Sequence, residues 1–133
     1  MNVMKTVFPA LCIALITGLA ATGAEQMINV LEDIPYTDGR MGKRQLVDEA
    51  HLLVMQVALQ PGQQVPPHNA NSNVHLLIIE GQVIVTLDGN DTAAARGTLL
   101  PIAIQTPMSI RNDSRENASF LIFKSPHPSE IGP

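Results

Sequence analysis

The feature that most constrains the fold is a series of short apolar runs separated by turn residues, between residues 61 and 112. Only Glu80-Gly81 separates the run at residues 74–79 from the run at residues 82–87. We therefore predict two strands joined by a tight hairpin at the glycine. Short strands with turn signals at such close spacing predict an all-β sandwich or barrel.

Further apolar runs on both sides of these two strands extend the pattern. We predict strands at residues 51–60, 97–104, 108–111 and 118–124. Residues 90–96 follow the turn residues Asp88 and Gly89 and contain three alanines, so we predict a loop there.

These runs define one domain. The barrel is expected to span residues 51–125. An N-terminal arm at residues 25–50, with a short strand near residues 27–31, would precede it. A tail with three prolines, at residues 126–133, would follow it.

The run at residues 74–79 also bears on assembly. Successive residues of a strand point to opposite faces of the sheet, so Val74 and Leu76 share one face and His75 and Leu77 share the other. Both faces are apolar apart from His75, so we expect both to be covered. A second sheet would cover one face and a neighbouring subunit the other, which predicts a homodimer.

Residues 1–24 have the layout of a secretory signal peptide. Lys5 precedes an apolar run, and small residues ending at Ala24 follow it. The apolar run is shorter than the roughly 20 residues that a membrane-spanning helix needs. We therefore expect cleavage near Ala24 and a periplasmic or secreted protein with no membrane attachment, although an uncleaved anchor is an alternative.

The charge of the chain argues against nucleic acid as a partner. Loss of residues 1–24 would remove Lys5 and no acidic residue. Lys plus Arg would fall from 8 to 7 against 12 Asp plus Glu, and the formal net charge would move from −4 to −5. The basic residues are scattered and no set of aromatic residues accompanies them, so nucleic-acid binding has no support.

Two histidines in the central stretch are the first candidates for a site. The stiff, extended segment Val65-Pro66-Pro67 leads directly to His68. His75 lies within the run at residues 74–79. In the register set by Gly81 it faces away from His68, whereas a shift of one residue would turn it to the same side.

Glycines and polar residues at fixed separations carry a resemblance to a known family. Gly62 and His68 have the separation found in the first sequence motif of the cupin family, and Gly81 matches the closing glycine of that motif. Gly97 and Asn112 fit the ends of the second cupin motif. The stretch resembles the cupin family over about half of the chain. This resemblance implies a single-domain cupin β-barrel, the jelly-roll-like double-stranded β-helix.

The same resemblance implies an altered site. In cupins, two histidines and a glutamate of the first motif and a histidine of the second hold one metal ion. These four positions correspond to His68, Ala70, Val74 and Met108, so only the first ligand is present. Gln105 also stands where the family has a glycine. The resemblance therefore implies the cupin scaffold without its standard metal site.

We expect an exported cupin that binds a small, rather apolar molecule or a partner in its barrel. The expected ligand-binding residues are His68, His75 and Met108, with no cofactor and no assigned catalytic residue. The alternative is a metal-dependent cupin, oxidoreductase-like, dioxygenase-like or copper-binding, in which the same three residues hold one ion of copper, iron or manganese. A methionine thioether suits Cu(I) among these ions. Whether the protein is an enzyme stays open between these alternatives.

Overall fold

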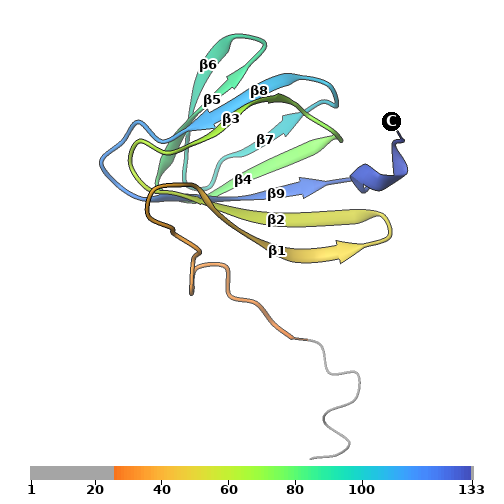
Figure 1. Ribbon diagram of the computed structural model, residues 1–133, viewed down its shortest axis with the longest axis horizontal. Helices are drawn as coiled ribbons and strands as arrows, with labels where there is room; N and C mark the ends of the chain where they lie inside the picture. The colour runs from red at the N-terminus through yellow and green to blue at the C-terminus, as the bar shows by residue number, and fades with distance from the viewer. Residues whose placement is uncertain (1–25, 133) are drawn as a thin grey trace, which may run out of the picture.

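A computed structural model describes residues 26–132, which form two antiparallel β-sheets that face each other (Figure 1). The predicted signal segment, residues 1–24, lies outside the described residues. No helix in the described part of the chain is long and apolar enough to span a bilayer.

Nine strands account for most of the described chain. The larger sheet has the order β1 (Gly42–Glu49), β2 (Leu52–Leu59), β9 (Ala118–Lys124), β4 (Val74–Glu80) and β7 (Leu99–Ile102). The smaller sheet has the order β3 (Gln64–Asn69), β8 (Pro107–Arg111), β5 (Gln82–Leu87) and β6 (Asn90–Ala95). One short 3-10 helix, η1 (Pro128–Glu130), follows β9. The prediction of an all-β barrel is confirmed.

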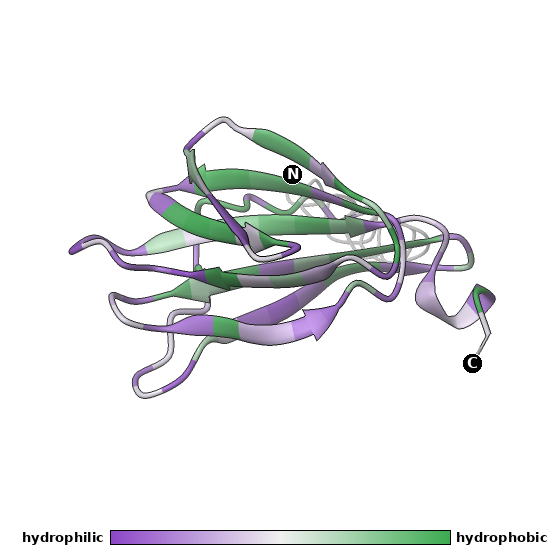
Figure 2. Ribbon diagram, turned by 90° about the horizontal axis from the view of Figure 1, so that it is seen from above, coloured by the Kyte–Doolittle hydropathy of each residue, from purple (hydrophilic) through white to green (hydrophobic). Residues whose placement is uncertain are grey.

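The core lies between the two sheets and is aliphatic. Alternation along β4 places Leu76 and Ile78 inside, where they are 0% and 1% exposed, as the strand pattern predicted. Hydrophobic segments lie along the strands, while the connecting loops are mainly hydrophilic (Figure 2). Seven core residues, each at most 2% exposed, form what we call the packed region: Leu59, Ile78, Val83, Val85, Ala94, Ala118 and Phe120.

The predicted hairpin at Gly81 is wrong, although both of its strands are present. β4 pairs with β7 and β9, whereas β5 pairs with β6 and β8, so the chain passes from one sheet to the other at Gly81. Gly81 has φ +72°, and a Cβ there would lie 2.3 Å from the carbonyl oxygen of Asn117. A glycine is therefore required by the close approach of the start of β9 as well as by the backbone angle.

The predicted loop at residues 90–96 is also wrong, because Asn90–Ala95 forms β6. Asp88 and Gly89 are the two central residues of a hairpin and have φ angles of 51° and 82°. Positive φ at both positions is the type I′ geometry, whose twist matches that of the flanking strands. The turn therefore directs the alanine-rich segment back along β5, and pairing overrides the low strand propensity of alanine.

The predicted N-terminal arm contains a strand of the barrel. β1 lies within residues 25–50 and pairs along β2, whereas the strand expected near residues 27–31 is replaced by a turn at Val30 and Leu31. The turn is fixed to the outer face of the larger sheet. The fully buried Gln56 side chain donates hydrogen bonds to the Val30 carbonyl oxygen at 2.8 Å and to Ser119 Oγ at 3.1 Å. The arm thus supplies one of the hydrogen-bond partners that this buried polar side chain needs.

Candidate functional site

A cavity of about 320 Å³ lies between the two sheets. Most of its wall is aliphatic or thioether, and six strands contribute to it: β1, β2, β3, β4, β8 and β9. None of the packed-region residues lines the cavity. The interior of the barrel is therefore divided between a close-packed part and a hollow part.

His68 and Met108 meet at this cavity, as cross-strand partners on β3 and β8. Met108 is 6% exposed. His68 Nδ1 lies 2.9 Å from the carbonyl oxygen of Pro66. A carbonyl can only accept, so Nδ1 donates, and Nε2 of the neutral ring is left as the acceptor for a ligand. Pro66 thus fixes both the orientation and the tautomer of the histidine.

His75 does not join them. It is exposed and alternates along β4 with the buried Val74 and Leu76, which line the cavity. Its side chain instead borders a shallow outer depression beside Pro101. The register set by Gly81 therefore holds, and the shifted register that would bring His75 toward His68 does not occur.

The four positions that correspond to the cupin metal ligands all lie on the cavity wall: His68, Ala70, Val74 and Met108. Ala70 and Val74 are 2% and 3% exposed and offer no donor atom. Among residues 26–132, no three histidine, aspartate or glutamate side chains lie close enough to share one ion. The donor set therefore does not fit a three-histidine, one-carboxylate site, and a hard divalent cation would find a single nitrogen.

Two lysines that were not predicted to belong to the site also line the cavity. Lys43 comes from β1 and Lys124 from the end of β9. Lys124 Nζ donates a hydrogen bond to Asn71 Oδ1 at 3.0 Å. Burial lowers the pKa of the Lys124 ammonium, and the charge of Lys43 lowers it further. Lys124 could have been found from sequence, since it alternates in phase with the inward-facing Phe120 and Ile122.

Two further methionines, Met41 and Met55, line the same cavity. Together with Met108 they give three thioethers around one space. Methionine is unbranched and adapts its shape, so such a wall can fit ligands of different outline. No local pattern in the sequence predicts this grouping, because it depends on the pairing of β1 with β2.

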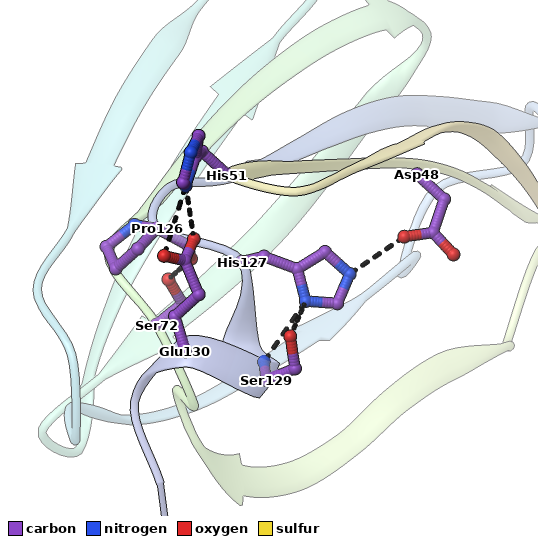
Figure 3. Close-up of polar contacts among 7 residues, drawn as sticks. All are labelled: Asp48, His51, Ser72, Pro126, His127, Ser129 and Glu130. Carbon is purple, nitrogen blue, oxygen red and sulfur yellow. Dashed lines mark hydrogen bonds and ion pairs between the residues drawn. The ribbon is translucent and has the colours of Figure 1, made fainter.

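Polar contacts tie the C-terminal tail to the β3–β4 loop and to β1 (Figure 3). Ser72, fully buried in the loop between β3 and β4, donates a hydrogen bond to the Pro126 carbonyl oxygen. His127 Nε2 lies 2.8 Å from Asp48 Oδ1, which ties the tail to β1. The loop held in this way carries Asn71, the hydrogen-bond partner of Lys124.

A second pair fastens the end of the tail, between Glu130 and His51 of the β1–β2 turn, at 2.9 Å (Figure 3). The His51 side chain is 82% exposed, so this contact contributes little to stability by itself.

Two motif residues have structural roles away from the cavity. Asn112 is fully buried; its Nδ2 donates to the carbonyl oxygens of Leu59 and Glu116, and its Oδ1 accepts from Ser114. The backbone N–H of Gly62 donates to the Asn112 carbonyl oxygen at 2.8 Å. The two motifs therefore meet at one end of the barrel, which they close.

Comparison with known proteins supports this architecture. The chain is 31% identical over 87 residues to an uncharacterized protein of Methanocaldococcus jannaschii, a match that covers 65% of this chain and 75% of that protein. The crystal structure of that protein is described as an RmlC-like cupin family protein with a double-stranded β-helix fold. It superposes with a TM-score of 0.71 and 27% identity, over 82% of this chain and 97% of that chain.

A second solved structure, an RmlC-like cupin protein from Desulfovibrio desulfuricans, shares the fold. It has a TM-score of 0.66 and 23% identity, over 77% of this chain and 98% of that one. No protein-family model matches the sequence. The archaeal relative, the two-sheet barrel and the motif residues at its closed end agree, and the chain belongs to the cupin family.

Proposed function

We propose that this protein binds a small, rather apolar molecule in the cavity between its sheets. The observation that carries the proposal is the cavity itself, of about 320 Å³ with walls that are mainly aliphatic and thioether. Small-molecule sites begin at roughly 300 Å³ and are lined mostly by apolar side chains with a few polar groups. His68 supplies one such group, with Nε2 available to a ligand.

Binding of an uncharged apolar fluorophore, N-phenylnaphthylamine, tests this proposal. Its emission rises when it leaves water, so saturable enhancement is expected with the wild-type protein. Ala70→Leu adds volume to the cavity wall and should weaken the enhancement, while Ala93→Leu adds the same volume to an exposed position of β6 and should not. Circular dichroism would verify that both variants are folded. Equal enhancement by wild type and Ala70→Leu would contradict the proposal.

A second candidate is a soft-metal site. It is favoured by one observation, that His68 shares the cavity with the thioethers of Met41, Met55 and Met108. Thioether and imidazole ligands suit Cu(I) rather than a hard cation. The two ammonium groups of Lys43 and Lys124 on the same wall oppose it, because they repel a cation.

Titration with Cu(I) under reducing conditions separates the two candidates. A soft-metal site requires stoichiometric binding that either His68→Ala or Met108→Ala abolishes, and a thermal stability that rises with metal only in the wild type. We expect no stoichiometric retention.

Export and dimerisation complete the proposal. Cleavage near Ala24, expected from the sequence, would place the protein in the periplasm or outside the cell. Leu77 and Ile79 lie partly buried on the outer face of β4, and Leu99 on the neighbouring β7 is 59% exposed. These residues support a homodimer through the outer face of the larger sheet. Light scattering of wild type against Leu99→Lys should show a dimer that the charge disrupts, and a wild-type monomer at micromolar concentration would contradict it.

A further inference from the structure

The two lysines of the cavity lack an acidic partner within the part of the chain that the structure describes. Among residues 26–132, the ion pairs join His51 to Glu130, Arg111 to Asp91 and Asp113, and His127 to Asp48. Neither Lys43 nor Lys124 takes part in any of them. The side chain of Lys124 donates a hydrogen bond to the neutral Asn71 amide. Two cations therefore border an apolar space without a carboxylate to compensate them.

The lack of an acidic partner for these lysines, within residues 26–132, contrasts with the acidic composition of the chain. Acidic residues outnumber lysine and arginine by 12 to 8, so carboxylates are plentiful. Arg111 has two acidic partners on the outside of the barrel. Yet every charged group on the cavity wall is a lysine. Burial of an ammonium next to another ammonium costs free energy, and Lys124 is half-buried with Lys43 close enough to lower its pKa.

A bound anion would remove that cost. Its charge would interact with the half-buried ammonium of Lys124, where such interactions are stronger than in water, and with the exposed ammonium of Lys43. The rest of the wall is apolar, so the remainder of the ligand must be apolar too. His68 Nε2 and Asn71 add neutral polar contacts on the same wall.

We propose that the cavity binds an amphiphilic carboxylate, with its carboxylate between Lys43 and Lys124 and its apolar part against Met41, Met55 and Met108. This proposal rests on the proposed function, since it names the class of molecule that the cavity takes. The same two lysines disfavour a cationic ligand or a metal ion.

Calorimetric titration with three probes of one chain length tests the proposal: octanoate, octanol and octylammonium, at low salt and below micellar concentrations. Hydrogen bonds to a charged group contribute more binding free energy than neutral ones, so octanoate should bind about tenfold more tightly than octanol. Octylammonium should bind more weakly than octanol. Added salt should weaken octanoate binding and leave octanol binding nearly constant.

Variants locate the charge effect. Lys124→Met and Lys43→Met keep the aliphatic stems and remove the ammonium groups. Each should reduce the octanoate affinity, and the double variant should no longer discriminate octanoate from octanol. Arg96→Gln removes the same charge from an exposed residue outside the cavity and should retain the full discrimination. Lys43 is exposed, so its single variant gives a reading even if the double variant fails to fold.

The outcomes separate the two proposals. Equal affinities of wild type for octanoate and octanol would overturn the carboxylate proposal and leave the cavity as a site for neutral apolar molecules. Discrimination that Arg96→Gln loses as fully as Lys124→Met would also overturn it, since overall charge would then be the cause. If none of the three probes binds, and the uncharged fluorophore does not bind either, the proposed function fails together with the carboxylate proposal.

Discussion

The packed region and the cavity occupy the same barrel but differ in how their polar groups are paired. At the closed end beside the packed region, Asn112 is fully buried and both of its side-chain polar atoms are hydrogen-bonded within the protein. At the cavity, Lys43 and Lys124 have no acidic partner among residues 26–132. The difference indicates that the packed region stabilises the fold, whereas the cavity has charged groups that a ligand can pair.

Truncation of two residues on the same face of β4 tests this difference, and it should have the largest effect on the free energy of unfolding. Ile78 lies in the packed region and Leu76 lines the cavity, although they are 1% and 0% exposed on the same face of one strand. Ile78→Ala should lower the free energy of unfolding by about 4 kcal/mol, in the upper part of the usual range for a large aliphatic residue. Leu76→Ala should cost about 2–3 kcal/mol, because its side chain already borders empty space.

Denaturant unfolding of both variants provides the measurement. A larger loss of unfolding free energy for Leu76→Ala than for Ile78→Ala would contradict this difference, since the cavity wall would then contribute at least as much stability as the packed region.

Removal of the Asn112 side chain tests the closed end. Asn112→Ala leaves the carbonyl oxygens of Leu59 and Glu116 without their donor, so we expect a loss of about 3 kcal/mol in the free energy of unfolding. Asn117→Ala, at an exposed position five residues along, is the control and should change stability by less than about 0.5 kcal/mol. Similar small effects for both would show that the motif asparagine is not needed to close the barrel.

The two predicted site residues at the cavity should separate packing from binding. Met108→Ala should destabilise the protein by about 2 kcal/mol, at the lower end of the range for buried methionine. His68→Ala removes an exposed side chain and should change stability by less than about 1 kcal/mol while it lowers affinity for ligands of the cavity. Thermal unfolding and fluorophore titration would measure the two effects, and a large stability loss for His68→Ala would count against a binding role.

The smallest effect concerns the pH dependence of stability. The pKa of Lys124 is lowered by burial and then by Lys43, so the folded protein binds this proton less tightly than the unfolded chain does. Charged Lys124 therefore lowers the free energy of unfolding at neutral pH. The free energy of unfolding rises as the pH passes through the lowered pKa toward the usual lysine value of 10.5.

The titratable groups that face the cavity are Lys43 and Lys124, from β1 and β9, and His68 from β3. Of these groups, Lys124 is the one whose pKa is lowered by burial. Lys124→Met should flatten the alkaline rise in the free energy of unfolding relative to wild type, and an unchanged slope would contradict the assignment.

Local patterns in the sequence predicted most strands but not their partners. Alternation of Val74, Leu76 and Ile78 is set by the pleat of a single strand and was correct. Whether the chain turns back at Gly81 or crosses to the other sheet depends on which distant strands pair with β4 and β5, which no local pattern reveals. Alanine-rich β6 was missed because its pairing follows from the turn at Asp88 rather than from its own propensity.

The candidate site was predicted in part for the same reason. His68 and Met108 were found because motif spacing fixes their positions, and the structure pairs them across two strands. His75 was a candidate that the observed register directs outward. Lys43 was not placed at the site because β1 was taken for part of a solvated arm, so the charge of the cavity could not be predicted without the sheet order.

Methyl NMR of the methionines during an octanoate titration would show directly whether an amphiphilic carboxylate binds in the cavity. Met41, Met55 and Met108 line the cavity, while Met27 is 100% exposed and serves as an internal control. We expect the methyl signals of the three cavity methionines to shift together and saturate. The Met27 signal should not shift, and octylammonium should produce smaller shifts than octanoate. Equal small shifts of Met27 and the cavity methionines, or none at all, would contradict this expectation.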